Sequence, residues 1–288
     1  MAWFLICILS VIWGSSFILI KRGLFTPDGL PIFEAYEVAL FRLMCAFLVL
    51  LPFMFVAAKK IPKSKWGIVV LSGFLGNAIP AFLFALAQTK LSSALTGVLN
   101  SLTPFFTLFI GVLFFKIMPK KKAYWGVLLG MLGSIVLIVS SKDFNTEGLV
   151  YGLLIVGATL CYGLNVNILK KYLHEFSPIS ITALSFFVSG LLATIFALSF
   201  TNIDLVVDDS VYRNAFLHIA LLGILGTAGA LILFNYLIKI SSAVFASSVT
   251  YAMPIVAIAW GLMDGEIFGF VQFLGTATII SGVRLIKS

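Results

Sequence analysis

Charged residues are scarce in this sequence, and their scarcity argues against a soluble globular fold. Only 10% of the 288 residues are charged, whereas 61% are hydrophobic. An average soluble domain carries roughly 25% charged residues. So few charges cannot cover the surface of a soluble domain of this length, and we therefore expect most of the chain to lie in lipid.

Acids and histidines are especially few, which weighs against catalysis. The chain has 11 Asp and Glu residues and two histidines, His174 and His218. An intramembrane enzyme would need paired acids, an H-E-x-x-H motif or a Ser/His pair at membrane depth. We see none of these, so we predict that the protein is not an enzyme. An intramembrane enzyme and a non-transporting receptor or scaffold are the alternatives from other functional classes.

The three cysteines, Cys7, Cys45 and Cys161, are far apart in the sequence. No C-x-x-C motif or Cys/His cluster is present, which argues against a disulfide framework and a metal site. We interpret the cysteines as small buried hydrophobic residues. We predict no metal and no cofactor.

Long apolar runs fill the sequence. About 20 apolar residues cross a bilayer core about 30 Å thick. Continuous runs predict helices, because barrel strands would alternate polar and apolar residues. We therefore predict an all-α membrane protein, one compact domain of ten transmembrane helices. The expected spans lie near 1–20, 32–57, 67–88, 92–115, 123–140, 148–169, 178–200, 214–237, 242–263 and 268–286.

The first run could instead be a secretory signal peptide. Such a peptide begins with basic residues and ends at a small-residue cleavage site. Here Lys21 and Arg22 follow the run, and no Ala-x-Ala site is present. We expect residues 1–20 to remain as a membrane helix.

Basic residues give the chain a net charge of +8, which by itself would suggest nucleic acid. They gather, however, in alternate connections between the expected spans. Cytoplasmic loops of membrane proteins carry an excess of Lys and Arg. We therefore predict that both termini are cytoplasmic and that no nucleic acid is bound. Thirteen basic residues lie on the side of the termini: Lys59, Lys60, Lys63, Lys65, Lys116, Lys120, Lys121, Lys122, Lys170, Lys171, Lys239, Arg284 and Lys287. Five lie on the other side: Lys21, Arg22, Lys90, Lys142 and Arg213.

The two halves of the chain resemble each other. WGSSFILIK at 13–21 aligns with YGLNVNILK at 162–170, and KLSSA at 90–94 aligns with KISSA at 239–243, both with an offset of 149 residues. Further pairs follow in the same order: GFLG at 73–76 with GILG at 223–226, Pro104 with Pro254, Gly126 with Gly275, and Gly133 with Gly282. We predict two five-helix repeats, 1–143 and 144–288. Because five is odd, the second repeat is expected to be inverted in the membrane, as in secondary transporters.

These motifs resemble the EamA type of the drug/metabolite transporter superfamily. The resemblance covers essentially the whole chain and rests on the order of several weak motifs. They are WGSSF, ALFRLMCAFLVL in the second span, Leu102–Pro104, Gly265–Glu266 and the terminal stretch from Gly275 to Val283. The resemblance implies ten helices, an inner-membrane location and movement of small organic metabolites, often amino-acid export. One departure is KIMPKKK at 116–122, where the family usually has a glutamate like Glu266.

Polar residues within the spans are candidates for a substrate site, because they tend to face protein or water. Threonines and an asparagine recur on one face of the fourth span, and a similar face lies in its repeat partner, the ninth. Such small residues also serve helix packing, and hydroxyls often bond to their own helix. We predict that substrate is bound near the midplane by Trp13, Ser16, Asn77, Asn100, Thr103, Tyr162, Asn165, Asn235 and Tyr251.

Two charged residues receive separate predictions. Arg42 is the deepest charge, and its side chain could bind a carboxylate or phosphate. Because the second span is expected to lie outside the cavity, we favour a structural role, with Arg42 bonding to helix-end carbonyls or to an acid such as Glu37. Glu266 is the candidate for proton coupling; a facilitator or exchanger without strict coupling is the alternative.

Together these patterns predict a secondary transporter or exporter of small metabolites. The predicted binding groups are neutral, which suits amino acids or similar zwitterions. The alternative cargos are a nucleobase, a cofactor precursor or a hydrophobic cation, although a cation would call for carboxylates at the midplane. The expected partners are the lipid bilayer, a small-molecule substrate and the candidate coupling proton. The sequence leaves the oligomeric state open, a monomer included.

Overall fold

The computed structural model describes residues 1–139, 146–201, 203–263 and 269–287, and within them the regular elements are helices joined by short connections. No strand forms within these ranges. Seven helical segments are long and apolar enough to cross a membrane: Ala2–Leu24, Ala35–Lys60, Lys63–Ala87, Ser93–Phe115, Gly148–Leu173, Pro178–Phe200 and Ser210–Ile240. The expectation of an all-α membrane protein is confirmed at this level. The other three expected spans fall on α7, on α13 with α14, and on α15, and their count as spans stays a prediction.

The helices of the first half run from α1 to α7. Their bounds are α1 Ala2–Leu24, α2 Ala35–Lys60, η1 Lys63–Lys65, α3 Trp66–Gly73, η2 Phe74–Ala78, α4 Ile79–Ala87, α5 Ser93–Asn100, α6 Thr103–Phe115 and α7 Lys121–Val139. The segment η2 is a π-helix that joins α3 and α4 into one continuous helical segment.

The second half repeats much of this order. Its elements are α8 Thr146–Ile168, η3 Leu169–Leu173, α9 Pro178–Phe200, α10 Leu205–Asp208, α11 Ser210–Leu221, η4 Leu222–Gly229, α12 Ala230–Ile240, α13 Ala243–Ser247, α14 Val249–Met263 and α15 Phe270–Lys287. The π-helix η4 joins α11 to α12, as η2 joins α3 to α4.

Two helical segments are interrupted near their middle. The chain leaves the α-helix between α5 and α6, at Ser101 and Leu102, and Pro104 occupies the first turn of α6, where its missing N–H costs little. A second break at Ser248 separates α13 from α14. Broken helices at membrane depth are tolerated where they are buried in protein or line a cavity.

The serine pairs of the repeated KLSSA and KISSA motifs start two of these broken helices. Ser92 accepts a hydrogen bond from the Leu95 amide at the start of α5, and Ser242 accepts one from the Phe245 amide at the start of α13. A serine cap satisfies one of the free amides at a helix start. The motifs therefore mark helix N-termini in both halves.

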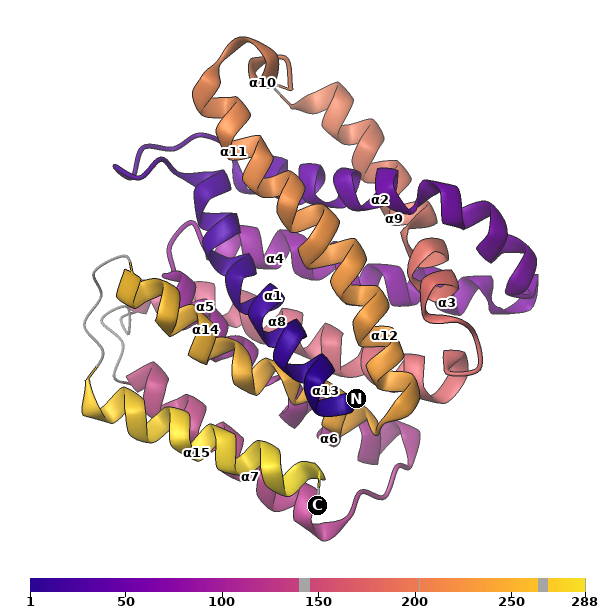
Figure 1. Ribbon diagram of the computed structural model, residues 1–288, viewed down its shortest axis with the longest axis vertical. Coiled ribbons are helices and arrows are strands. Elements are labelled where there is room, and N and C mark those ends of the chain that lie inside the picture. The colour runs from indigo at the N-terminus through magenta and orange to yellow at the C-terminus, as the bar shows by residue number, and fades with distance from the viewer. Residues whose placement is uncertain (140–145, 202, 264–268, 288) are drawn as a thin grey trace.

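Packing brings helices of the two halves together (Figure 1). α7 lies along α15, α2 against α9, α1 against α14, and α6 against α8. Gly190 of α9 allows close approach to α2, because a Cβ there would lie 2.6 Å from the Phe47 Cβ. The core is therefore one body built from both halves.

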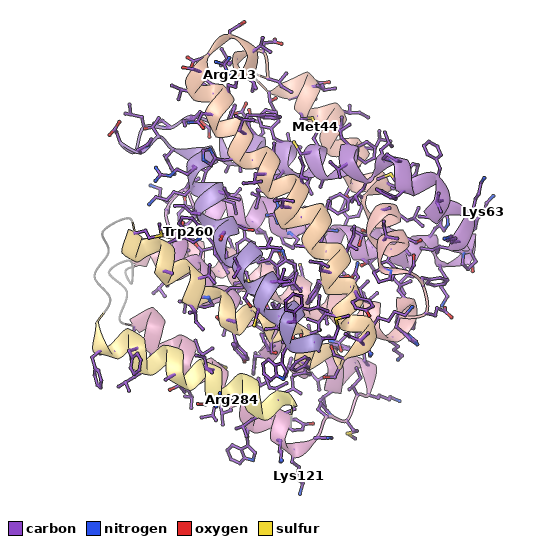
Figure 2. The ribbon with its side chains drawn as sticks, in the orientation of Figure 1. Met44, Lys63, Lys121, Arg213, Trp260 and Arg284 are labelled. Carbon is purple, nitrogen blue, oxygen red and sulfur yellow. The ribbon has the colours of Figure 1, made fainter. Side chains whose placement is uncertain are left out.

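Three basic residues expected in the connections between the spans are labelled in Figure 2. Lys63 and Lys121 lie at the right and the bottom of Figure 2, whereas Arg213 lies at the top. Both termini lie in the lower half of Figure 1. The cytoplasmic location of both termini stays a prediction.

Candidate functional site

A cavity of about 80 Å³ lies where broken and π-helical segments of both halves meet. Asn100 and Thr103 reach it from either side of the break between α5 and α6. Ser247 and Thr250 do so from either side of the break between α13 and α14. Seven of the nine predicted substrate-binding residues line it: Trp13, Ser16, Asn77, Asn100, Thr103, Tyr162 and Asn165. No carboxylate is among the described residues that line the cavity.

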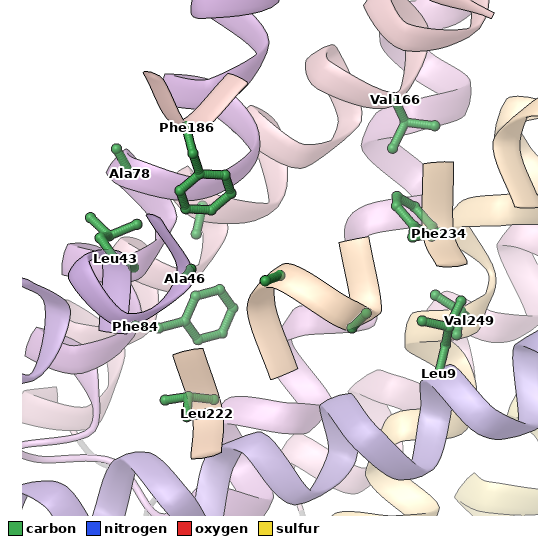
Figure 3. Packing of buried hydrophobic residues seen from close by; sticks show 14 of the residues in the cluster. Leu9, Leu43, Ala46, Ala78, Phe84, Val166, Phe186, Leu222, Phe234 and Val249 are labelled. Carbon is green, nitrogen blue, oxygen red and sulfur yellow. The ribbon is translucent and has the colours of Figure 1, made fainter. Parts of the chain in front are cut away.

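Aromatic rings form much of the cavity wall. Trp13 of α1 meets Phe234 of α12 with ring centroids 5.0 Å apart, and Phe84 of α4 lies 6.0 Å from Tyr162 of α8. Figure 3 shows Phe84 and Phe234 among the buried residues, reaching in from different elements. Phenylalanine has no polar group, so Phe84 and Phe234 provide apolar contact between the few polar side chains of the cavity.

The π-helix η4 supplies a backbone acceptor at the cavity. The Trp13 indole Nε1 donates to the Gly226 carbonyl at 2.8 Å. Ser16, one turn along α1, lies beside the same glycine, since a Cβ on Gly226 would be 3.0 Å from the Ser16 Oγ. π-helical turns are rare and often occur at functional sites. Gly226 and its neighbour Thr227 both line the cavity, and the sequence reasoning selected neither.

The π-helix η2 makes the corresponding contact with α8. Just before η2, Ser72 Oγ of α3 donates to Asn165 Oδ1 at 2.6 Å. A Cβ on Gly76 would overlap with Asn165 Nδ2, so this amide packs directly on the glycine backbone. In the repeat, Asn165 corresponds to Ser16 and Gly76 to Gly226. Both halves therefore bring a polar side chain from the first helix of the repeat onto a glycine of the π-helix.

Asn100 takes part in one bond within its own broken helix and in one contact with the other broken helix. Thr103 Oγ1 donates to the Asn100 carbonyl at 2.8 Å, and Asn100 Nδ2 makes a 3.5 Å contact with Met253 Sδ of α14. A thioether sulfur is a weak acceptor. The Asn100 amide is therefore held loosely and can exchange this contact for a stronger acceptor.

Arg42 also lines the cavity, although α2 was expected to lie outside it. Its Nε donates to Thr227 Oγ1 at 2.8 Å, so its partner is a hydroxyl and not Glu37. Glu37 Oε2 instead accepts a hydrogen bond from the Glu34 amide at the start of α2. The difference arises because α2 packs against η4, where Gly223 allows the helices to come close.

Asn235 and Tyr251 lie away from the cavity. Asn235 Nδ2 donates to Thr182 Oγ1 of α9 at 2.9 Å. Tyr251 is fully buried, and its hydroxyl donates to the Val127 carbonyl of α7 at 3.2 Å. Both side chains therefore join helices to one another. Glu266, the coupling candidate, lies outside the described residues.

A second, larger cavity of about 730 Å³ lies at the end of the molecule that contains the termini. Ala2, Lys120, Lys170 and Lys171 are among its lining residues. Thr107 of α6 also lines it, one helical turn beyond Thr103 of the first cavity. The two cavities are therefore close neighbours along α6.

Comparison with known proteins identifies the family and a shared fold. The family model described as the EamA-like transporter family matches residues 1–139 and 149–288. A solved crystal structure is similar over 99% of this chain and 95% of its own, with a TM-score of 0.72 and 13% sequence identity, which indicates a shared fold.

Several curated relatives are named as transporters. An uncharacterized inner membrane transporter, YedA of Escherichia coli (strain K12), is 25% identical over 96% of this chain and 88% of its own. The S-adenosylmethionine/S-adenosylhomocysteine transporter of Chlamydia muridarum is 26% identical over 99% of this chain and 91% of its own. A probable amino-acid metabolite efflux pump of Salmonella typhimurium is 26% identical over 61% of this chain and 55% of its own.

Proposed function

Because this chain belongs to the EamA-like transporter family, we propose that it moves amino acids or similar zwitterions across the inner membrane by alternating access. The observation that carries the proposal is the cavity, which both halves of the chain line with polar and aromatic groups. Small-molecule sites are mostly apolar pockets with a few placed polar groups. Neither histidine lines this cavity, and the proposal includes no catalytic step.

The proposal includes ten spans arranged as two inverted repeats. Support comes from reciprocal contacts between α7 and α15. A Cβ on Gly126 would lie 2.6 Å from the Gly282 carbonyl, and a Cβ on Gly133 would lie 2.6 Å from the Gly275 carbonyl. Gly126 corresponds to Gly275 in the repeat, and Gly133 to Gly282. Contacts in which i meets j and the counterpart of i meets the counterpart of j are typical of a two-fold axis.

A second pair of contacts supports the same axis. Gly14 of α1 packs on α14, where its Cβ would lie 2.6 Å from the Val256 Cβ. Its repeat partner Gly163 of α8 packs on α6, where its Cβ would lie 2.9 Å from the Thr107 amide nitrogen. Thr107 and Val256 are 149 residues apart, the same offset that relates WGSSFILIK to YGLNVNILK and KLSSA to KISSA. The proposal keeps the predicted division into two repeats, 1–143 and 144–288, because the residues of each contact pair have counterparts in the other half.

Alternating access is supported by the difference between the two cavities. The inner cavity, at about 80 Å³, is smaller than the ~300–1,000 Å³ of typical ligand pockets. At the wall of the larger cavity, Asn167 Nδ2 donates to the Thr107 carbonyl at 2.9 Å and to the Gly163 carbonyl at 2.8 Å. We propose that α6 and α8 separate here when cargo passes toward the lysine-rich, cytoplasmic side.

The relatives suggest two kinds of cargo. One is named for S-adenosylmethionine and S-adenosylhomocysteine, and another for an amino-acid metabolite. S-adenosylmethionine is itself an α-amino acid, so a site for an amino acid's polar groups fits both names. The inner cavity favours the smaller amino acid, because an adenosyl group would require more space.

Counterflow in proteoliposomes tests the proposal. Liposomes with the purified protein are preloaded with one unlabelled solute, and uptake of the same labelled solute is measured. The panel contains neutral, basic and acidic amino acids, S-adenosylmethionine, nucleobases and organic cations. We expect exchange of amino acids and a loss of at least about tenfold in Asn100→Ala, because its amide lines the cavity.

Each result of this assay has a distinct meaning. Exchange of nucleobases or cations without amino acids would contradict the proposed cargo and keep the transporter. Absence of exchange for every solute would contradict both. A flux that does not respond to an imposed pH gradient would contradict proton coupling through Glu266.

A further inference from the structure

Arg42 is a charged residue in the interior of a membrane protein, and its surroundings indicate where it acts. Its neighbours in α2, Phe41 and Leu43, are 0% and 1% exposed. Arg42 itself is only partly buried and lines the inner cavity. The guanidinium is therefore accessible from the cavity.

The hydrogen bonding of Arg42 is incomplete. Of the five N–H donors of a guanidinium, the one on Nε is bonded to Thr227. The other four donate to no residue in the described part of the chain, and no described carboxylate forms an ion pair with Arg42. A charged side chain inside a membrane protein that has no counter-charge carries a cost in free energy. An anion that enters the cavity would remove that cost.

A second polar group at the cavity is also incomplete. Asn77 of η2 is 8% exposed, lines the cavity, and has a buried Oδ1 for which no described residue acts as donor. A buried acceptor that has no donor is destabilising. The cavity thus combines a cation that lacks an anion with an acceptor that lacks a donor.

We infer that Arg42 binds a carboxylate of the cargo through its terminal nitrogens and that Asn77 accepts a hydrogen bond from an N–H group of the same molecule. This inference rests on the proposed transport function and assigns its substrate class. A planar carboxylate matches the guanidinium fork in a two-bond arrangement. Arg42 is the only cation among the described lining residues, so a singly charged carboxylate is neutralised, whereas a phosphate dianion would keep an excess charge.

Apart from Arg42, the described residues that line the cavity carry no charge. Once the carboxylate has neutralised Arg42, the ammonium group of an amino acid is left with neutral acceptors, Asn77 among them. A cargo with a second positive charge would meet no acid in the described lining. The site therefore favours neutral α-amino acids over arginine or lysine.

The test uses matched pairs of solutes with the purified full chain in proteoliposomes. The probes are L-leucine, L-threonine and L-phenylalanine, each compared with its carboxamide, which keeps the ammonium group and removes the carboxylate. Wild-type protein is expected to exchange the acids at least about tenfold better than the amides. Arg42→Gln is expected to lose this preference, and Arg42→Lys to keep a reduced one, since an ammonium provides charge without the fork.

Two further variants complete the experiment. Arg213→Gln removes an exposed arginine that does not line the cavity and should leave exchange unchanged. Asn77→Ala should raise the KM for the acids by about tenfold. Size-exclusion chromatography and thermal unfolding report folding. If Arg42→Gln does not fold, the acid-to-amide ratio of the wild type and of Asn77→Ala still tests the inference.

Several outcomes would overturn the inference. Equal exchange of acids and amides by wild-type protein would show that the carboxylate is not bound. An acid preference that survives in Arg42→Gln would place the carboxylate elsewhere. If only solutes without a carboxylate exchange, such as nucleobases, the transporter proposal stands and this inference fails. If nothing on either panel exchanges, both fail.

Discussion

Tyr251 shows how a polar residue on a predicted cavity face can serve packing instead. It lies on the same helix as Thr250 and Met253, which line the cavity, but its ring points toward α7. Gly130 of α7 has no side chain at the place where the ring packs, and a Cβ there would overlap with it. The phenol then reaches the Val127 carbonyl.

The prediction at this scale concerns Tyr251→Phe. We expect a loss of about 0.5–1.5 kcal/mol in stability, because the buried bond to the Val127 carbonyl disappears while the ring remains. The KM for exchanged amino acids should not change. Thermal unfolding in detergent and counterflow measure the two quantities. A raised KM with unchanged stability would instead place Tyr251 in the substrate site.

At the scale of elements, glycines set the distance between helices. α7 and α15 cross with backbone against backbone at Gly133 and Gly275. Small residues at such crossings allow van der Waals contact that drives helix association in lipid. Other helical glycines have open surroundings: a Cβ on Gly67 of α3 would meet nothing within 4 Å. The same residue type therefore has different importance in different helices.

This contrast gives a matched pair of substitutions. Gly133→Ala should destabilise the protein by about 1–3 kcal/mol, because the new methyl group pushes α7 away from α15. Gly67→Ala should be neutral or stabilising by up to about 1 kcal/mol, since alanine favours helix. Thermal unfolding of both variants in the same detergent is the measurement. Equal effects would contradict the close crossing of α7 and α15.

At the scale of the whole molecule, the distribution of lysines predicts orientation. Lys63 and Asp28 lie in exposed connections on opposite expected sides. An excess of basic residues favours the cytoplasmic side. The side that carries Lys63 also carries both termini and the larger cavity, whose lining includes Ala2 and Lys120.

Cysteine labelling tests this orientation. The three native cysteines are replaced by alanine, and Asp28→Cys or Lys63→Cys is added. A membrane-impermeant maleimide should label residue 28 in intact bacterial cells, and residue 63 only after the cells are opened. Labelling in the reverse order would invert the predicted topology. Labelling of both in intact cells would show that residues 28 and 63 do not lie on opposite sides.

The sequence by itself determined the helical class, the repeat offset and most of the cavity's polar residues, because long apolar runs and polar faces are local properties of a chain in lipid. For that reason the sequence predicted Trp13, Asn100 and Asn165, which line the cavity. Only the tertiary structure decided which faces meet. Periodicity defines a face of one helix but not the helix opposite, so Tyr251 packs on α7 and Arg42 reaches the cavity through the close contact of α2 with η4.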